Sequence, residues 1–558
     1  MVMKESKLEK ISLPRCNLAC PAGINVQKYI GEIAKGKFRE AWYTIVEENP
    51  LPGLSGYLCT RPCEYNCYLR YKNGEQVLIK ELKRFVSEWF FEEEAGFPTL
   101  NYPVKWYEKV GVFGEGISAL IAVWILRKEG IKVDLFTDLD NILGPWYKLG
   151  SKDTFPKELF KKEAERILED KNVALFQFSK DELSDSSIMD RFKKDTYSAL
   201  ILAYDSSSFD FPFPLENKTE KNQKNILSSL EAIEILEREG SLNIENAIVI
   251  YGGDLFTILT SIIIKSKTKA KVLLLYPYSF ERLPCDSFYI EKAIKIGVDF
   301  LCDQLITEAR DYNDKIELKA VSHNGIQSKF IVDKAVLKTW RVNNFPKALS
   351  IVNNLGNIEV DENFESSLPK VFALGECVTG PKNIIETIAH VKYNGLRIIY
   401  SIKGEKFNST QVEPFPILKE REEIDFEPKK KLSSYEFITN TSFARREAER
   451  CLRCGPCYLC DECSLICVYR FWYDRESKSW IRGNRDHKEK LYARVLEDRC
   501  IGCGNCVDIC NYKVINVLEK KDGKRVAYIN KEFCKGCGWC KESCLYNAIE
   551  LVGIEKWI

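Results

Sequence analysis

Cysteine is the residue type that departs most from ordinary usage, since the 558-residue chain holds 22 Cys and only three His. Nineteen of the cysteines fall in three groups, at 16–67, 451–467 and 500–544. No export signal is recognisable, so a reducing compartment disfavours disulfides, and clustered thiolates then favour metal ligation. The scarcity of His argues against zinc and against His-based acid-base catalysis.

The C-terminal group is an internal repeat, CIGCGNCVDIC from Cys500 and CKGCGWCKESC from Cys534. Each copy has the spacing C-x2-C-x2-C-x3-C, in which three thiolates hold one iron-sulfur cubane and the fourth ligates the other. Two zinc ribbons are the weaker alternative, because zinc sites pair two C-x2-C knuckles. The repeat predicts two [4Fe-4S] clusters, one on Cys500, Cys503, Cys506 and Cys544 and the other on Cys534, Cys537, Cys540 and Cys510.

The other two groups leave more than one ligand set open. In the middle group the cluster spacing recurs at Cys457, Cys460, Cys463 and Cys467, which leaves Cys451 and Cys454 over. A register in which Cys451, Cys454 and Cys457 take the cluster fits nearly as well. The N-terminal group supplies thiolates for one four-Cys cluster but not for two, at Cys16, Cys20, Cys59, Cys63 and Cys67.

These sites need several domains to position them, and the length favours three or more. Amphipathic stretches predict a helical N-terminal domain, and short apolar strands alternating with helices predict doubly wound parallel sheets. The expected fold is multidomain α/β, with a helical iron-sulfur domain (1–100), one Rossmann-like domain in two parts (101–244 and 346–404), a second, degenerate Rossmann-like domain (245–345), a six-Cys linker (405–470) and an α+β bacterial-type ferredoxin domain (471–558).

One glycine motif follows the first strand of the Rossmann-like region. Gly114, Gly116 and Ala119 form G-x-G-x-x-A, in which small residues let a dinucleotide pyrophosphate approach a helix N-terminus. Such a motif is weak evidence by itself.

The first 400 residues resemble the small (beta) subunit of glutamate synthase and related iron-sulfur flavoproteins, including the N-terminal half of dihydropyrimidine dehydrogenase. The resemblance rests on CPAGINVQKYI, EENPLPGLSGYLCTRPCEYNC, GVFGEGISAL and FALGECVTGPKNIIETIAHVKYNG, which follow one another in the family's order. It implies FAD, with contacts expected at Gly111, Gly114, Gly116, Ala119, Asp138, Gly375, Glu376 and Thr387.

In that family the N-terminal domain holds two [4Fe-4S] clusters, and a C-x2-C pair precedes the positions that match Cys16 and Cys20. The pair is missing here, and the segment ARREAERCLRC resembles the one that carries it. The resemblance suggests that one cluster is held by Cys16, Cys67, Cys451 and Cys454, and another by Cys20, Cys59, Cys63 and a non-Cys ligand. The chain would then carry at least three and as many as five clusters.

The family's nicotinamide loop is altered in this sequence. Tyr251 replaces a turn glycine, Phe256 replaces a small residue, and Asp254 places negative charge beside a would-be phosphate. Pro277 and Tyr278 stand where the family has two Arg for the 2'-phosphate of NADPH. Glycines are also missing from AYDSS (203–207) and KTWRV (338–342). We therefore expect a retained fold that has lost NAD(P)H binding.

The predicted function is electron transfer within a larger cytoplasmic oxidoreductase complex. The chain would be one subunit of a hetero-oligomer and would relay electrons between a catalytic subunit and ferredoxin or another redox protein, through its clusters and FAD. Two alternatives are an NAD(P)H-dependent oxidoreductase of the glutamate synthase small-subunit type and a cluster-bearing scaffold without active flavin. The net charge of +1 gives no reason to expect nucleic acid, no apolar run could span a membrane, and no catalytic acid, base or nucleophile is evident.

Overall fold

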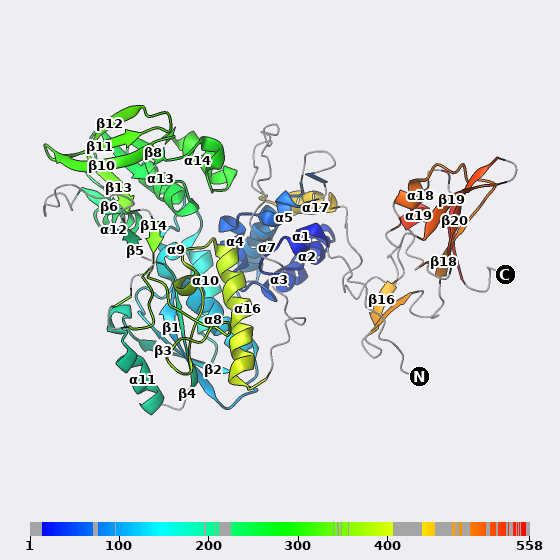
Figure 1. The fold of residues 1–558 in the computed structure, drawn as a ribbon, viewed down its shortest axis with the longest axis horizontal. Coiled ribbons are helices and arrows are strands. Elements are labelled where there is room, and N and C mark those ends of the chain that lie inside the picture. Colours follow the sequence, from blue (N-terminus) through cyan, green and yellow to red (C-terminus); the bar gives the residue numbers. More distant parts are fainter. Residues whose placement is uncertain are drawn as a thin grey trace. The chain divides into compact units, whose positions relative to one another are not determined.

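The computed structural model of the protein describes residues 14–210, 225–405, 438–451 and 471–553, with gaps inside these ranges at 68, 71–75, 95, 195–196, 207, 339, 343–344, 347–348, 355, 475–478, 483–490, 509, 511–513, 521–522, 532–533, 535–538, 543, 545 and 547. The chain divides into two compact units, residues 15–453 in one and residues 454–558 with 1–14 in the other. Most of their helices and strands are labelled in Figure 1.

The N-terminal domain is a group of short helices around an aromatic core. Its helices are α1 (Arg15–Leu18), α2 (Val26–Ala34), α3 (Phe38–Val46), α4 (Pro52–Leu58), α5 (Pro62–Tyr65) and α7 (Ile79–Glu93). Trp42 is fully buried and stacks on Phe90, with ring centroids 3.9 Å apart. Proline begins α4 and α5, where the missing backbone amide has no helical partner to lose. Cys16 lies in α1 and Cys63 in α5, and Cys20, Cys59 and Cys67 lie outside the helices.

The first sheet has the order β15-β4-β1-β2-β3, and every neighbouring pair is parallel. Its strands are β1 (Lys109–Glu115), β2 (Lys132–Thr137), β3 (Val173–Gln177), β4 (Tyr197–Tyr204) and β15 (Val371–Ala373). The helices that follow and cover these strands are α8 (Gly116–Lys128), α9 (Gly144–Lys148), α10 (Lys157–Leu168), α11 (Asp185–Lys194), α15 (Glu376–Thr379) and α16 (Ile384–Ile402). Helix α8 is buried along almost its whole length, because α16 and the sheet enclose it.

The second sheet has the order β6-β13-β7-β8-β9 and is also parallel. It contains β6 (Ile226–Ser228), β7 (Ala247–Tyr251), β8 (Lys271–Tyr276), β9 (Val298–Cys302) and β13 (Lys334–Lys338), with helices α12 (Ser229–Glu239), α13 (Leu255–Lys267) and α14 (Ser287–Ile296). An antiparallel sheet of β10 (Leu305–Tyr312), β11 (Lys315–Val321) and β12 (Gln327–Val332) adjoins it, and β5 (Ser208–Asp210) pairs with β14 (Trp340–Val342). Two parallel Rossmann-like sheets are present, as the sequence predicts; one face of the second sheet packs against α12–α14 and the other against β10–β12.

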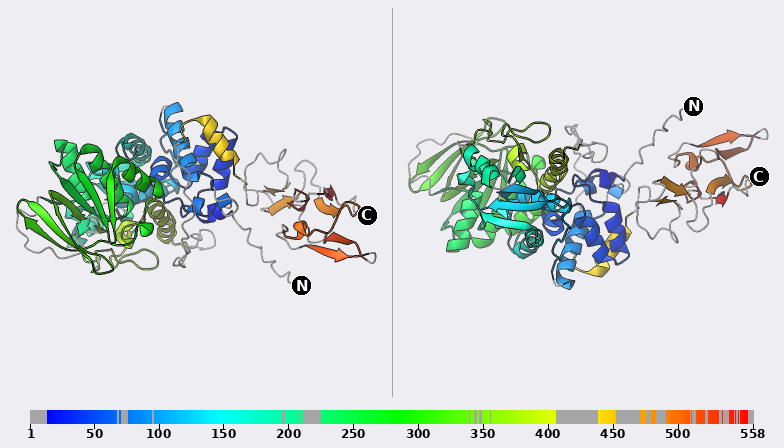
Figure 2. Two further views of the ribbon diagram at one scale, coloured as in Figure 1. Left: turned by 90° about the horizontal axis from the view of Figure 1, so that it is seen from above. Right: turned by 90° about the horizontal axis from the view of Figure 1, so that it is seen from below.

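Helix α17 (Thr441–Glu449) lies near the C-terminal end of the first unit's sequence but packs against the N-terminal domain. Figures 1 and 2 both show this yellow-orange helix among the blue N-terminal helices, and α17 contacts α2 and α7. Asn440 caps it by accepting a hydrogen bond from the backbone N–H of Phe443 at 2.8 Å. The polypeptide thus brings residues near 450 next to residues near 30 and 80.

The described part of the C-terminal unit has a core of two antiparallel strand pairs and two short helices. The pairs are β18 (Leu491–Val495) with β21 (Ile549–Gly553) and β19 (Ile515–Glu519) with β20 (Arg525–Ile529), and the helices are α18 (Asn505–Asp508) and α19 (Trp539–Glu542). Strands β16 (Phe471–Asp474) and β17 (Ser479–Arg482) form a further antiparallel pair. Across the described residues of both units, none of the helices has the length and apolar character needed to cross a bilayer.

Candidate functional site

The first candidate site is the turn between β1 and α8, which carries the G-x-G-x-x-A motif. Gly114 allows β1 and β4 to approach closely, since a Cβ on Gly114 would overlap the carbonyl oxygen of Ala203. Gly116 has φ of +75° and begins α8 in a left-handed conformation that favours glycine. Ala119 is buried, and its methyl group faces Gly114. These small residues form the tight strand-to-helix turn of a dinucleotide-binding fold.

A carboxylate occupies the N-terminus of α8. Asp205, which follows β4, accepts hydrogen bonds from the backbone N–H groups of Ile117 (2.8 Å) and Ser118 (2.9 Å). The hydroxyl of Ser118 donates a third hydrogen bond to the same carboxylate at 2.6 Å. The preceding amide, on Gly116, donates to the carbonyl oxygen of Ile142 at 2.9 Å. The first three backbone amides of α8 therefore all donate to groups of the protein itself.

A second carboxylate lies close to Asp205. Glu376 is buried and accepts hydrogen bonds from the backbone N–H of Ser206 (3.0 Å) and from the hydroxyl of Thr387 (3.2 Å). Burial, together with the negative charge of Glu376, raises the pKa of Asp205 to about 7. The surroundings of this turn therefore disfavour additional negative charge.

The eight residues expected to contact FAD lie in three places. Six are at this turn or directly beside it, namely Gly114, Gly116, Ala119, Gly375, Glu376 and Thr387. Gly111 is inside β1, where a Cβ would lie 2.5 Å from the side chain of Leu200. The lack of a side chain at this position therefore serves the packing of the sheet. Asp138 follows β2 and accepts a 2.7 Å hydrogen bond from the side chain of Asn141.

The second candidate site is the turn between β7 and α13, where the family binds its nicotinamide nucleotide. Asp254 is the N-cap of α13 and accepts a 2.8 Å hydrogen bond from the backbone N–H of Thr257. The ring of Tyr276 covers the loop, because a Cβ on Gly253 would lie 2.6 Å from that ring. Phe256 is buried in α13 with its ring 5.4 Å from that of Trp146. The loop is filled by the chain's own side chains.

The N-terminal domain gathers the first group of cysteines. Cys20, Cys59 and Cys63 are buried, whereas Cys16 and Cys67 are partly exposed. Burial raises the pKa of the Cys63 thiol, and the charges of Cys59, Glu64 and Cys20 raise it further. The Cys59 sulfur accepts a hydrogen bond from the backbone N–H of Arg61 at 3.3 Å.

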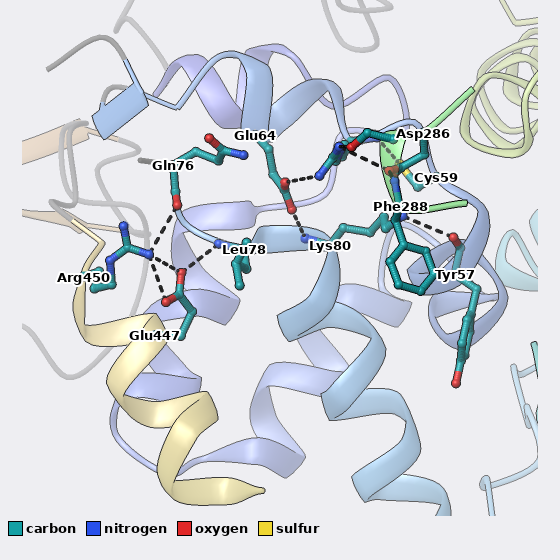
Figure 3. A network of polar contacts seen from close by, with 12 residues as sticks. Tyr57, Cys59, Glu64, Gln76, Leu78, Lys80, Asp286, Phe288, Glu447 and Arg450 are labelled. Carbon is teal, nitrogen blue, oxygen red and sulfur yellow. Dashed lines mark hydrogen bonds and ion pairs between the residues drawn. The ribbon is translucent and has the colours of Figure 1, made fainter. Parts of the chain in front are cut away.

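Helix α17 brings Cys451 to this domain. The Glu447 carboxylate accepts a 2.9 Å hydrogen bond from the backbone N–H of Leu78, and Arg450 donates to the carbonyl oxygen of Gln76 at 3.3 Å (Figure 3). Cys451, the next residue, is partly buried against the main hydrophobic core of the first unit. The remaining predicted ligands of the middle group lie outside the described residues, namely Cys454, Cys457, Cys460, Cys463 and Cys467.

A buried ionic network joins the N-terminal domain to the second sheet, and the sequence gives no local sign of it. Lys80 forms a 2.6 Å ion pair with Asp286, the N-cap of α14, and Arg61 pairs with the same carboxylate at 3.2 Å. Glu64 lies 3.5 Å from Arg61 and accepts a hydrogen bond from the backbone N–H of Lys80 (Figure 3). Burial tends to raise the pKa of Asp286, but Lys80 and Arg61 outweigh burial and hold that pKa below its usual value.

The C-terminal unit places the four ligands predicted for the first ferredoxin cluster around one pocket. A pocket is lined by Cys500, Cys503, Cys506 and Cys544, which is the ligand set predicted for the first cluster. The Cys500 and Cys544 sulfurs accept backbone N–H hydrogen bonds from Ala527 (3.4 Å) and Ala548 (3.3 Å), as cluster thiolates commonly do.

Three of the four ligands predicted for the second ferredoxin cluster are described. Cys534 and Cys540 are buried and Cys510 is partly exposed, whereas Cys537 lies outside the described residues. Across the described part of both units, no three His, Cys, Asp or Glu side chains converge closely enough to hold a single metal ion.

Comparisons with protein-family models place these sites in known domains. The model described as pyridine nucleotide-disulphide oxidoreductase matches residues 108–391, just over half of the chain. The model described as dihydropyrimidine dehydrogenase domain II, 4Fe-4S cluster, matches residues 9–95. Two models described as 4Fe-4S dicluster domain match residues 456–515 and 493–551.

Curated relatives share this domain order in part. The putative oxidoreductase YgfK of Escherichia coli O157:H7 is 22% identical over 529 residues, which cover 89% of this chain and 47% of the relative. The NAD-dependent dihydropyrimidine dehydrogenase subunit PreT of the same organism is 24% identical over 396 residues, covering 70% of this chain and 91% of the relative. The NADPH-Fe(3+) oxidoreductase subunit beta of Geobacter sulfurreducens is 33% identical over 133 residues, covering 24% and 19%.

The chain spans about half the length of the YgfK relative. Among solved structures, thioredoxin reductase from T. acidophilum aligns with a TM-score of 0.40 and 15% identity, covering 53% of this chain and 97% of that chain.

The iron-sulfur and flavin-oxidoreductase domains define a class, the multidomain iron-sulfur flavoprotein oxidoreductases, whose cofactors are [4Fe-4S] clusters and FAD. The chain belongs to the pyridine nucleotide-disulphide oxidoreductase family and is homologous to beta subunits of multi-subunit oxidoreductases. The predicted resemblance and the predicted cofactors are confirmed.

The turn that should receive the FAD pyrophosphate nevertheless differs from what that group requires. In this fold a pyrophosphate takes the amides at the N-terminus of the first helix. Here Asp205 and the carbonyl oxygen of Ile142 already hold those amides. As the residues stand, the turn does not fit the pyrophosphate.

Proposed function

We propose that this chain is an electron-transfer subunit that relays single electrons between a catalytic partner subunit and ferredoxin or another redox carrier. The support is the placement of iron-sulfur domains at both ends of the chain, at residues 9–95 and 456–551. Clusters pass one electron at a time, so this route requires neither hydride transfer nor a flavin. The complex would be a hetero-oligomer, as the subunit names of several relatives suggest, and we propose that it is cytoplasmic.

The observation that carries the proposal is the filled nicotinamide turn. Asp254 caps α13 where the pyrophosphate of NAD(P)H would approach, and the ring of Tyr276 lies over Gly253. A dianionic pyrophosphate would meet both a carboxylate and an aromatic ring at this helix N-terminus. Reducing equivalents would therefore enter through a protein partner instead of through NAD(P)H.

The printed names of the relatives favour a second candidate. PreT is described as NAD-dependent, and the Geobacter protein is described as an NADPH-Fe(3+) oxidoreductase subunit. An NAD(P)H-dependent oxidoreductase would need a nicotinamide turn that opens around Tyr276 and Asp254.

The docking of α17 supports a specific ligand set for the N-terminal clusters. We propose that Cys451 and Cys454 join Cys16 and Cys67 around one cluster, because α17 ends at Cys451 against the N-terminal core. Cys20, Cys59 and Cys63 would hold a second cluster. With the linker cluster and the two ferredoxin clusters the chain would bind about 20 Fe. An anaerobic iron assay near 12 Fe would contradict this assignment.

Electron entry can be tested on the anaerobically purified chain. The visible absorbance of the clusters is followed after addition of NADH, NADPH or chemically reduced ferredoxin. We expect bleaching within seconds by reduced ferredoxin and none on that timescale by either nicotinamide nucleotide. Rapid reduction by NADH or NADPH would overturn the proposal and favour the nucleotide-dependent oxidoreductase.

A further inference from the structure

We propose that Asp205 is an internal ligand of the flavin site, and that its carboxylate and the pyrophosphate of FAD exclude one another. FAD then binds only when the Asp205 carboxylate leaves the N-terminus of α8. This inference goes beyond the proposed electron relay. The relay runs through the clusters, so it stands even if the inference about Asp205 fails.

The first argument is the number of hydrogen-bond donors. A pyrophosphate at a helix N-terminus is held by the free backbone N–H groups of the first turn. The backbone N–H groups of Ile117 and Ser118 both donate to the Asp205 carboxylate, at 2.8 and 2.9 Å. Gly116 donates to Ile142. A phosphate oxygen could gain these donors only by displacing Asp205.

The second argument is space. The Cα of Gly116, where the motif leaves room for a phosphate, faces the Asp205 carboxylate so closely that a Cβ on Gly116 would overlap it. On another side, a Cβ on Gly144 would lie 2.6 Å from the Cα of Gly116. The room that the motif glycine provides is therefore taken up by Asp205 and by the backbone near Gly144.

The third argument is charge. Asp205 is completely buried, and Glu376 lies close enough to disfavour its ionisation. The backbone N–H of Glu376 also donates to the hydroxyl of Ser118, at 3.4 Å, so the second carboxylate approaches the same turn. Two carboxylates already share the weak positive potential of one helix N-terminus, which a dianionic group would need for itself.

The test is equilibrium binding to the full chain with its clusters intact. Three probes separate the parts of the ligand: FAD, ADP, which has the pyrophosphate without the flavin, and riboflavin, which has the flavin without phosphate. Asp205→Gly removes the carboxylate and its volume, whereas Asp205→Asn removes only the charge. Asp333→Asn is a matched control, because the Asp333 carboxylate also accepts backbone hydrogen bonds, from Asn246 and Ala247. These residues lie at the start of β7, at the end of that strand away from the nicotinamide turn.

We expect Asp205→Gly to bind FAD and ADP at least tenfold more tightly than the unaltered chain, with riboflavin binding unchanged. Asp205→Asn should show the same selectivity with a smaller gain of about threefold, and Asp333→Asn should match the unaltered chain. If Asp205→Gly loses helical circular dichroism, Asp205→Asn decides the question. The proposal is overturned if neither variant gains affinity for FAD, or if riboflavin gains as much as FAD does.

Discussion

The two Rossmann-like sheets place carboxylates in the same two positions but balance their charge differently. Each sheet has a carboxylate at its nucleotide-type turn, Asp205 in the first and Asp254 in the second. Each is also joined to the N-terminal domain by a carboxylate. In the first sheet Glu163 of α10 accepts hydrogen bonds from the backbone N–H groups of Gly53 and Leu54, and in the second sheet Asp286 pairs with two cations.

The difference lies in what stabilises the charge. Burial raises the pKa of Glu163 to about 7, as it does for Asp205, because backbone amides do not fully compensate for lost solvation. Asp286 has a lowered pKa, because Lys80 and Arg61 outweigh burial. The first sheet therefore holds carboxylates that are close to taking up protons near neutral pH, whereas Lys80 and Arg61 keep Asp286 of the second sheet ionised.

The largest expected effect comes from breaking the ionic network. Replacing Lys80 by Met leaves Asp286 in a site where its side chain is only 3% exposed, with one cation in place of two. Removing one partner of a buried pair typically costs about 3–5 kcal/mol, because the other charge loses its compensation. We expect a loss of that size in the free energy of unfolding, measured by anaerobic urea denaturation at pH 7. A loss below about 1 kcal/mol would show that the network does not hold the second sheet in place.

The pH dependence of stability should reveal the carboxylates of the first sheet. Asp205 and Glu163 keep their protons in the folded chain up to about pH 7, whereas the unfolded chain releases them near its ordinary values of 3.8 and 4.5. The folded state binds more protons in this window, so stability falls as pH rises through it, by up to about 1.4 kcal/mol per unit of pKa difference. Asp286 acts oppositely, since its lowered pKa adds stability that is lost only in acid.

Glu163→Gln isolates one of these contributions. Gln cannot release a proton, so we expect urea midpoints measured from pH 6 to pH 8 to fall less steeply than in the unaltered chain. An unchanged slope would mean that the raised pKa of Glu163 does not contribute to stability.

Loss of the second turn's cap should have a smaller effect. Asp254→Ala removes the N-cap of α13, and such losses cost about 1 kcal/mol of stability. We expect no gain in NADPH binding, because the ring of Tyr276 still covers Gly253. Calorimetric titration with NADPH would check this expectation, and binding restored by this single change would show that Asp254 alone closes the turn.

The smallest effect is expected at the surface of the first sheet. Lys157 on α10 pairs with Glu237 of α12, and both side chains are substantially exposed. Lys157→Met should change the free energy of unfolding by less than about 1 kcal/mol, as is usual for exposed pairs. Lys157→Met is thus the matched control for Lys80→Met in the same urea denaturation experiment. Equal losses in the free energy of unfolding of the two variants would contradict the contrast between buried and exposed pairs.

Local features could be predicted from the sequence, and distant contacts could not. The ferredoxin ligands follow from spacing, since one tight loop supplies three of four thiolates. The sequence places the charge of Asp254 at the nicotinamide turn, and the structure shows that this carboxylate caps α13. The contact of Asp205 with α8 joins residues 88 positions apart, and that of Lys80 with Asp286 joins residues 206 apart. Only the fold brings such pairs together. The sequence shows that AYDSS lacks the family's glycine, but it does not show that the Asp205 carboxylate contacts the N-terminus of α8.

The most direct test of the account is a crystal structure of the protein saturated with FAD. We predict that any bound FAD places its pyrophosphate on the backbone amides of Ile117 and Ser118, with the Asp205 carboxylate withdrawn from both. A structure in which FAD is bound while Asp205 still accepts hydrogen bonds from those two amides would contradict the account.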